Sequence, residues 1–483
     1  MTFEYQRILR GDADLPISCP RIVIAGTNSG VGKTSVTLAI VSALRKRGLR
    51  VQTFKVGPDY LDPTYLSMAS GRPCYNLDGW MTNEDYVKRL FVDKASQADI
   101  SVIEGVMGLF DGSDAVGPEG STAEIASWLD APVVLVVNVH GLARSIAALV
   151  HGFTTFDPKV SISGAIANHC GSERHGMYLS ESLNAFGLPK LLASIPRGSL
   201  PGLPSRHLGL VSADVRILNR QVLDTLGEAM ERYCSISDIL EIAGSAPHLS
   251  RDLSNRQKET AEKSVRLGVA KDSAFHFYYQ DNLEALSAAG CALVEFSPLR
   301  DDSLPSGLDG VYFGGGYPEE YADELSKNMS MLNSVRQFAS TNRPVYAECG
   351  GLMYLSKGIE SLAGEKFELV GLLPSWTRML PRLKSLGYVE ATFSKDSLFG
   401  PEGRRIRGHE FHYSELIGDP LEDNHWTAAY RLRRRPAEIE NFEGFQRGNI
   451  LASYVHGHFA CRPDSVSHFV SICKNVKWQE KII

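Results

Sequence analysis

The sequence predicts an α/β protein of two parallel-sheet domains, and two features of the 483-residue chain support this fold class. Apolar, β-branched runs alternate with helical patterns over residues 20–244, and a second such series occupies residues 265–483. Continuous apolar strands that alternate with helices are typical of parallel sheets covered on both faces. Residues 245–264 are polar and nearly free of large apolar side chains, so we interpret them as a linker between the domains.

In the first domain, the expected strands are short apolar runs separated by helical patterns. These strands cover residues 21–28, 51–57, 100–106, 132–139, 162–168 and 191–196. Helices are expected from Lys33 to about Arg47, at 121–129, at 142–153 and within 213–244. In the second domain, strands are expected within 265–272, 308–316 and 344–350, and the pattern becomes richer in strands after residue 367.

Composition narrows the class of protein. Apolar residues make up 43% of the chain, and the net charge of −6 gives no basic field that would favour nucleic acid. No apolar run approaches the roughly 18 residues of a membrane span, and the polar N-terminus does not resemble a signal peptide. The eight cysteines form no CxxC pair, which favours neither a zinc site nor a disulfide framework. We therefore expect a cytoplasmic protein without nucleic-acid or membrane partners.

The motif GTNSGVGKT, residues 26–34, joins a predicted strand to a predicted helix. This is the context of a phosphate-binding loop, in which backbone N–H groups and a helix N-terminus surround phosphate oxygens. Lys33 would neutralise the β- and γ-phosphates of ATP, and Thr34 would bind Mg²⁺. The candidates for ATP binding are Thr27, Asn28, Gly30, Val31, Gly32, Lys33, Thr34, Lys55 and Asn168. The alternative is a glycine-rich helix entry without a ligand.

The loop is one residue longer than the usual motif, because Thr27 stands where the first glycine is expected. That lengthening resembles dethiobiotin synthetase-type ATPases. A magnesium site also needs acids at neighbouring strand ends, and Glu104 and Asp59 lie at two of them, with Lys55 near the phosphate that is transferred. Asp62 follows closely, but it is equally well explained as a helix cap.

A second motif, RPVYAECGGLMYL (343–355), places Cys349 on a sharp turn from strand to helix. A helix N-terminus favours a thiolate, so we expect a lowered pKa and a nucleophilic role; the alternative is a buried structural cysteine. Three glycines after another strand offer N–H groups for an oxyanion, and His456 near the C-terminus offers a base. The oxyanion candidates are Gly314, Gly315, Gly316 and Gly350.

Cysteine, glycine cluster and histidine in this chain order resemble class I glutamine amidotransferase domains, which release ammonia from glutamine. Those domains usually carry a glutamate two residues after the histidine, whereas this chain has His458. In this respect it resembles the cobyric acid branch. We expect His458 or a distant carboxylate to orient His456, or the Cys349–His456 pair to act as a dyad. Because alternate strand residues share a face, both imidazoles are expected at the site.

Over nearly the whole chain, the sequence resembles the cobyrinate a,c-diamide synthase family. The similar segments include FKVGPDYLDPTYLSMASGRPCYNLD, VIEGVMGLFDG, AFHFYYQDNLEAL, AECGGLMYL and ASYVHGHF. The resemblance implies a carbon–nitrogen ligase that uses glutamine and Mg-ATP to amidate the a and c acetates of a corrin precursor in cobalamin biosynthesis. Close relatives of that family act on hydrogenobyrinate or on nickel-sirohydrochlorin in coenzyme F430 synthesis, and both substrates stay open here.

A polycarboxylate substrate calls for cations beside apolar surface. The substrate-binding candidates are Tyr60, Leu61, Arg378, Arg382 and Arg407, and for the arginines a solvated basic face is an equal alternative. A rival function is an ATP-driven switch of the partitioning or septum-site type. Those proteins carry a lysine at the position of Asn28, and its absence here disfavours them.

Overall fold

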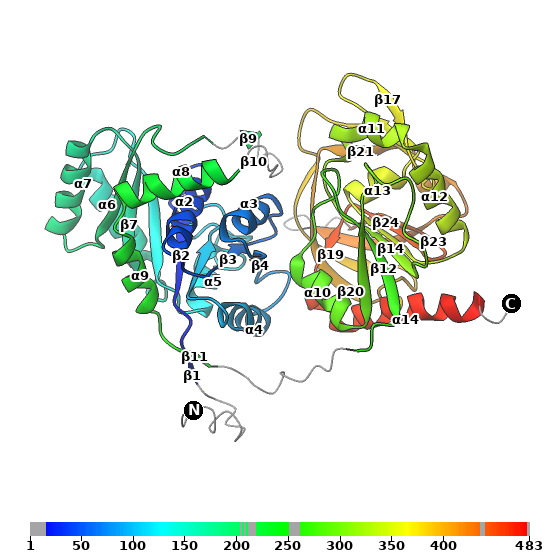
Figure 1. Ribbon diagram of the computed structural model, residues 1–483, viewed down its shortest axis with the longest axis horizontal. Coiled ribbons are helices and arrows are strands. Elements are labelled where there is room, and N and C mark those ends of the chain that lie inside the picture. The colour runs from blue at the N-terminus through cyan, green and yellow to red at the C-terminus, as the bar shows by residue number, and fades with distance from the viewer. Residues whose placement is uncertain are drawn as a thin grey trace. The chain divides into compact units, whose positions relative to one another are not determined.

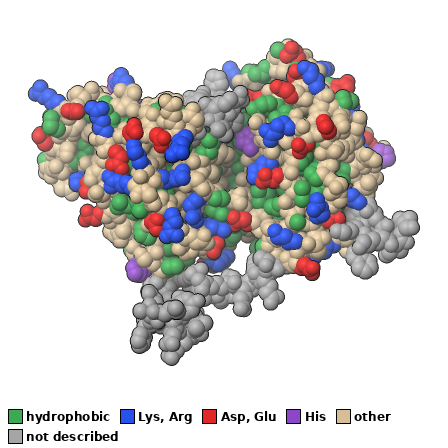
Figure 2. All heavy atoms as spheres, viewed as in Figure 1, with side chains coloured by type: hydrophobic (Ala, Val, Ile, Leu, Met, Phe, Trp, Pro, Cys, Tyr) green, Lys and Arg blue, Asp and Glu red, His purple; other side chains and the backbone are tan. Residues whose placement is uncertain are grey.

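The computed structural model describes residues 16–202, 205–206, 209–210, 219–250, 261–434 and 440–480. The chain divides into two compact units, residues 1–257 and 258–483 (Figure 1). Among the described helices, none is long and apolar enough to cross a membrane. On the face that Figure 2 presents, basic and acidic side chains are interspersed over both units.

The first unit is built on a seven-stranded sheet in which every strand pair is parallel, as the sequence predicts. Its spatial order is β4 (Tyr75–Leu77), β3 (Val51–Val56), β5 (Ile100–Glu104), β2 (Arg21–Gly26), β6 (Val133–Asn138), β7 (Ile162–Cys170) and β8 (Leu191–Pro196). All six residues of β2 are buried, because the strand lies centrally in a sheet covered on both faces.

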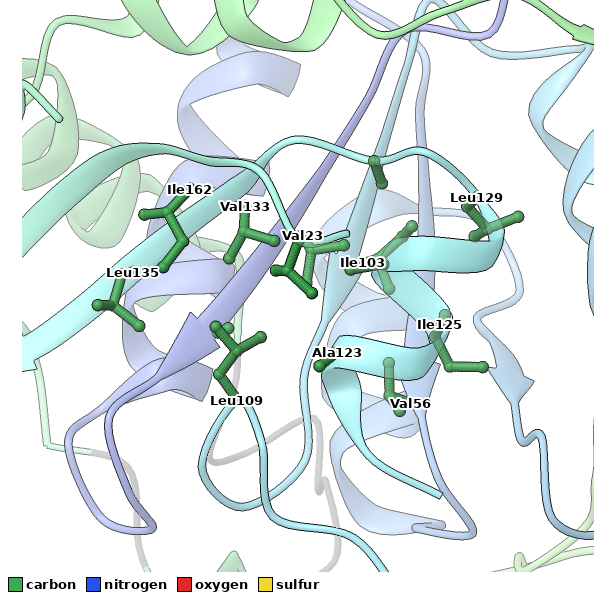
Figure 3. Close-up of a cluster of buried hydrophobic side chains, with 14 of the residues drawn as sticks. Val23, Val56, Ile103, Leu109, Ala123, Ile125, Leu129, Val133, Leu135 and Ile162 are labelled. Atoms are coloured by element: carbon green, nitrogen blue, oxygen red, sulfur yellow. The ribbon is translucent and has the colours of Figure 1, made fainter. Parts of the chain in front are cut away.

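Helices cover both faces of this sheet. One face packs against α4 (Glu84–Ala95), α5 (Thr122–Trp128), α6 (Ser145–Phe156) and α7 (Glu173–Ala185). The other packs against α2 (Lys33–Lys46), α3 (Leu61–Ser70), α8 (Arg220–Tyr233) and α9 (Ile236–Gly244). Figure 3 shows the first of these cores, where Val23 and Ile103 of the sheet lie near Ala123 and Ile125 of α5. The cores hold the ends of β2 and β5 in fixed register.

The beginning of the predicted linker is tied to the first unit. Residues Leu249–Ser250 form β11, which pairs with β1 (Pro16–Ile17). The carbonyl of Pro247 accepts a hydrogen bond of 2.8 Å from the buried guanidinium of Arg21. Residues 251–260 of that linker lie outside the described part, as do residues 213–218 of the predicted helical region 213–244. A short hairpin joins β9 (Ser205–Arg206) to β10 (Gly209–Leu210).

The second unit contains a mixed ten-stranded sheet rather than a wholly parallel one. Its parallel part is β13 (Cys291–Phe296), β12 (Val265–Ala270), β14 (Gly310–Phe313), β15 (Val345–Glu348) and β24 (Ile450–Ser453). Antiparallel strands extend it, in the order β23 (Glu440–Arg447), β22 (Thr427–Arg434), β19 (Ser385–Phe393), β20 (Arg405–His412) and β25 (His456–Gly457). The strand-rich pattern after residue 367 therefore forms this extension and a smaller sheet.

That smaller sheet has the order β17 (Lys366–Glu368), β16 (Gly358–Glu360), β18 (Trp376–Met379) and β21 (Ser414–Ile417). The helices of the second unit are α10 (Gln280–Ala288), α11 (Ala322–Lys327), α12 (Met329–Ser340), α13 (Gly350–Leu355) and α14 (Pro463–Glu480). Three short 3₁₀ turns, η2 (Pro318–Tyr321), η3 (Pro420–Glu422) and η4 (Phe459–Cys461), complete the described elements. Helices α11 to α13 pack on one face of the large sheet, and α10 and α14 pack on the other.

Candidate active sites

The loop between β2 and α2 forms a compact turn at the carboxyl edge of the first sheet. Gly30 and Gly32 have φ values of 78° and 93°, a left-handed conformation that glycine adopts without strain. The Lys33 ammonium is directed back across the loop, where it donates to the carbonyls of Asn28 and Met107. Thr27 and Asn28 bond to each other through their side chains at 3.0 Å. The sequence motif therefore folds as a closed loop that begins a helix.

Asn168 of strand β7 contacts this loop. The Asn168 amide donates to the carbonyl of Val31 at 2.8 Å, and a Cβ placed on Gly32 would lie 2.3 Å from the Asn168 Nδ2 atom. Next to it, a pocket of about 150 Å³ is lined by Gly32, Ser35, Asn168, His169, Ile195, Pro196, Gly198, Leu200, Pro201 and Gly202. Sequence reasoning did not include the residues after β8, although their glycines and prolines mark a loop at the same sheet edge.

Acids and a lysine meet at the ends of β3 and β5. Glu104 is fully buried; its Oε1 atom accepts from the Thr34 hydroxyl at 2.7 Å and from Lys55 Nζ at 2.9 Å. Lys55 also pairs with Asp62 at 2.6 Å, so Asp62 is part of the cluster as well as of the first turn of α3. Asp59 accepts from the amide of Leu61 at 2.7 Å. The predicted magnesium residues Thr34 and Glu104 are thus in contact.

Burial shapes the charges of this cluster. Desolvation raises the pKa of Glu104, and it raises that of Asp59 with a contribution from Asp62. Desolvation of Lys55 opposes its charge, but Asp62 and Glu104 outweigh it and hold the pKa of this ammonium above its usual value. The Oε2 atom of Glu104 is buried and accepts no hydrogen bond among the described residues. A cation that prefers oxygen ligands, such as Mg²⁺, would bind this oxygen atom.

The loop after β5 lies against the phosphate-binding loop. Met107 adopts a φ of 46°, a strained value for a residue with a side chain, and its carbonyl accepts from Lys33. Leu109 donates its amide to the carbonyl of Gly26 at 2.8 Å, and the Gly108 amide donates to Asp111 at 2.9 Å. These contacts couple the end of β5 to the loop that begins α2.

Burial, with repulsion from Lys55 as a smaller cause, lowers the pKa of Lys33 to about 8. Because ATP phosphates favour the ammonium form, we expect ATP to bind with proton uptake at pH 8.5, and its affinity to fall by at most about tenfold per pH unit above pH 8. Calorimetry without Mg²⁺, in two buffers of different ionisation enthalpy, measures this uptake. Lys46→Ala, at the exposed end of α2, should retain it. Equal heats in both buffers would contradict the prediction.

In the second unit, Cys349 lies on the predicted turn between β15 and α13. Its φ of 46° and ψ of −98° are strained for a residue with a side chain, and its amide donates to the carbonyl of Ser453 at 2.7 Å. The side chain is only 5% exposed. This is the geometry expected of a nucleophile on a strand-to-helix turn.

The predicted lowering of the cysteine pKa is wrong. Burial raises the pKa of the Cys349 thiol well above its usual value, and the Glu319 carboxylate adds to the effect. Helix α13 has only six residues, and a hydrogen bond from the Gly350 amide acts in the opposite direction, toward the thiolate. Burial therefore favours the thiol form of Cys349 over the thiolate.

The glycines of the second unit lie around this turn, but they are not equivalent. A Cβ on Gly350 would lie 3.0 Å from the Gly316 amide nitrogen, so these two residues are adjacent. A Cβ on Gly315 would lie 2.5 Å from the His456 ring, which explains why that position is glycine. The Gly314 amide donates to the Tyr278 hydroxyl at 2.8 Å. Gly314 is therefore removed from the oxyanion candidates.

The two histidines of the second motif face different partners. His456 is 1% exposed, and its Nδ1 atom lies 3.6 Å from the Glu348 carboxylate. His458 instead lies 3.3 Å from Asp281, and its ring packs against Tyr279. His458 directly follows β25 and keeps an extended backbone, with φ of −100° and ψ of 114°. His456 stacks on His409, whose Nδ1 atom bonds to the hydroxyl of the same Tyr279 that packs on His458. That both imidazoles act at one site stays a prediction.

The proposed substrate residues are spread over several elements. Tyr60 and Leu61 begin α3 beside the acidic cluster of the first unit. In the second unit, Arg378 pairs with Glu415 at 2.7 Å and Arg407 lies 3.9 Å from Glu390. Arg382 is exposed in the segment between β18 and β19. The charges of Arg378 and Arg407 are thus partly compensated by neighbouring acids.

Comparison with known proteins assigns each unit to a family. Residues 22–210 match a CobQ/CobB/MinD/ParA nucleotide binding domain, and residues 266–464 match a CobB/CobQ-like glutamine amidotransferase domain. A solved glutamine amidotransferase structure covers 43% of this chain and 98% of its own, at 17% identity and a TM-score of 0.30, which is too low to carry an argument.

Relatives align over almost the entire chain. A cobyrinate a,c-diamide synthase of Syntrophotalea carbinolica is 55% identical over 458 residues, which is 95% of this chain and 99% of the relative. One from Archaeoglobus fulgidus is 40% identical over 94% of this chain and 98% of the relative. With both units and nearly the full length matched at this level, the chain belongs to the cobyrinate a,c-diamide synthase family.

Proposed function

We propose that this protein is a glutamine-hydrolysing ligase that amidates the a and c acetate carboxylates of cobyrinate at the expense of ATP. The observation that carries the proposal is a phosphate-binding loop in one unit together with a strained, buried cysteine in the other, where the adjacent residue Glu348 lies 3.6 Å from His456. A carboxylate has no good leaving group, so it must be activated before ammonia can replace an oxygen. One unit supplies activation and the other supplies ammonia.

In the first unit, ATP binds with its phosphates on the loop of residues 26–34. Lys33 and the N-terminus of α2 compensate the phosphate charge. The pocket beside Asn168 and Gly198 is adjacent to this loop and accepts the base of the nucleotide. A substrate carboxylate oxygen attacks the γ-phosphorus and ADP leaves, which gives an acyl phosphate. Lys55, held by Glu104 and Asp62, stabilises the phosphoryl group during transfer.

Thr34, Asp59 and Glu104 are the proposed magnesium residues. A hydroxyl and carboxylate oxygens suit Mg²⁺, which in such sites takes few protein ligands and completes its shell with phosphate oxygens and water. The buried Oε2 atom of Glu104 fits this role, because it accepts no hydrogen bond among the described residues. When bound, the ion would neutralise charge between the β- and γ-phosphates.

In the second unit, Cys349 attacks the side-chain amide carbon of glutamine while His456 takes the thiol proton. The amides of Gly316 and Gly350 face the oxyanion of the tetrahedral intermediate, with Gly315 supporting the histidine. His456 then donates the proton to the departing ammonia, and water hydrolyses the thioester to glutamate. Ammonia attacks the acyl phosphate, phosphate leaves, and the amide is formed.

The identity of the tetrapyrrole rests on the named relatives, and hydrogenobyrinate and nickel-sirohydrochlorin are the alternatives. Tyr60 and Leu61 lie beside the acidic cluster and are the proposed contacts to the reacting carboxylate. Arg378, Arg382 and Arg407 are proposed to bind the other carboxylates, with the ion pairs of Arg378 and Arg407 exchanging partners. A partitioning-type switch is disfavoured, because it would leave Cys349 and His456 without a use.

Parallel turnover assays test this proposal. With glutamine and Mg-ATP, we expect cobyrinate to gain two amides and to give the highest kcat/KM, compared with hydrogenobyrinate and nickel-sirohydrochlorin. Mass spectrometry counts the amides, and coupled assays measure ADP and glutamate. Reactions without glutamine or without ATP serve as controls. ATP hydrolysis without amidation of any of the three tetrapyrroles would favour the switch and reject the ligase.

A further inference from the structure

The base His456 needs a group that orients its ring and stabilises the imidazolium form. The position two residues later does not provide one, because His458 faces Asp281 at 3.3 Å and packs on Tyr279 with ring centroids 4.9 Å apart. The carboxylate of Glu348, the residue immediately before Cys349, lies 3.6 Å from His456 Nδ1. Glu348 ends β15 and is 1% exposed, so it lies with His456 in one desolvated site.

We propose that Glu348 is the positioning residue of His456 and takes the role that a carboxylate after the histidine has elsewhere. This inference rests on the proposed glutaminase function and deepens it. The Oε2 atom of Glu348 lies 3.6 Å from His456 Nδ1, which is within ion-pair range and longer than a hydrogen bond. Catalytic hydrogen bonds are often long before substrate binds. We expect the distance between Glu348 Oε2 and His456 Nδ1 to shorten when His456 becomes charged.

Three donors fix the Glu348 carboxylate. The Tyr312 hydroxyl donates to Oε2 at 2.8 Å, the Tyr346 hydroxyl donates to Oε1, and the Gly457 amide donates to Oε1 at 3.2 Å. Burial, and next the charge of Glu348, raises the pKa of both phenols well above the usual value, so these groups remain donors. A carboxylate that accepts three hydrogen bonds is held in one orientation.

A second histidine, His409, lies against the ring of His456 and does not take this role. His409 stacks on its ring at 5.0 Å between centroids, and burial together with the charges of His456 and His458 lowers the pKa of His409 well below the usual value. A neutral imidazole stacked in this way neither accepts from the ring edge nor supplies negative charge. Glu348 therefore stabilises the imidazolium that forms when Cys349 gives up its proton.

The test compares Glu348→Gln with Asp281→Asn, the same chemical change at the carboxylate that faces the other histidine. For Glu348→Gln we expect glutaminase kcat to fall by about 10- to 10²-fold with little change in KM, and ammonia-dependent amidation to be retained. The pH at which iodoacetamide alkylates Cys349, followed by peptide mass spectrometry, should shift upward because thiolate and imidazolium form together. Asp281→Asn should lower glutaminase kcat less than Glu348→Gln does. His458→Ala should lower it less than His456→Ala does.

Wild-type glutaminase kcat in Glu348→Gln, or a larger loss in Asp281→Asn, would overturn the inference. If Glu348→Gln fails to fold, Tyr312→Phe and Tyr346→Phe test the proposal instead. Each variant removes one hydrogen bond to the Glu348 carboxylate and should lower glutaminase kcat several-fold. Unchanged kcat in both variants would reject the proposal. Failure of the proposed function has a different signature, since Cys349→Ala would then retain glutaminase activity. If Glu348→Gln keeps wild-type glutaminase activity while Cys349→Ala has none, the glutaminase function is supported and the positioning role of Glu348 is rejected.

Discussion

Replacing Lys33 with alanine is expected to lower the kcat of amidation by about 10²- to 10³-fold or more, with either nitrogen source. The acyl phosphate must form before ammonia attacks, whether ammonia comes from glutamine or from ammonium salt. Lys33 is the ammonium that the loop directs across its own backbone, and nothing else in that loop carries a positive charge. Steady-state assays of ADP release and amide formation, with each nitrogen source in turn, measure the loss.

Two further results make this prediction specific. Glutaminase activity should survive at least in part in Lys33→Ala, because it belongs to the other unit. Lys46→Ala is the matched control, since it removes a lysine from the same helix where it makes only an exposed pair with Glu228. Ammonia-dependent synthesis at the wild-type rate in Lys33→Ala would show that the ATP site lies elsewhere.

Replacing Cys349 with alanine is expected to reduce glutamine-dependent amidation to the background rate, while amidation with high ammonium salt continues. The cysteine forms the covalent bond to glutamine, and removal of a nucleophile leaves no alternative route to the thioester. Burial favours the thiol form of Cys349, so a base has to remove its proton before it attacks. The His456→Ala variant should therefore also lose glutaminase activity, by about 10²- to 10⁴-fold.

Cys291→Ala is the control for this variant, since Cys291 is fully buried in β13 and belongs to the hydrophobic core. It should keep both activities, with only the loss of stability that follows removal of a buried sulfur. Thermal unfolding of each variant shows whether the fold is intact. Loss of both glutamine- and ammonia-dependent amidation in a folded Cys349→Ala protein would contradict a division of labour between the two units.

Placing the two chemistries in separate units has a physical advantage. Phosphoryl transfer needs several charges close together, and the cluster of Lys33, Lys55, Asp62 and Glu104 supplies them. Thioester formation needs a cysteine whose thiol proton is removed by a base, and both Cys349 and His456 are buried in the second unit. Each environment would disturb the pKa values that the other depends on.

The sequence by itself determined the local parts of both sites. The alternation of apolar runs and helices predicted the parallel sheet of the first unit, and the structure confirms it. The loop at Lys33 and the turn at Cys349 each follow from a strand that leads into a helix, and Glu104 follows from its place at the end of a buried strand. Such features depend on residues that are close together in the sequence, so a single stretch of sequence contains them.

The tertiary structure alone decided how side chains from distant segments pair. Glu348 faces His456 across 108 positions of sequence, and His458 pairs with Asp281 from a helix far upstream, so neither pair could be identified from the local pattern. The thiol pKa of Cys349 was mispredicted for the same reason. A helix N-terminus can be identified from sequence, whereas desolvation depends on every element that packs around the sulfur, and those elements come from the whole second unit.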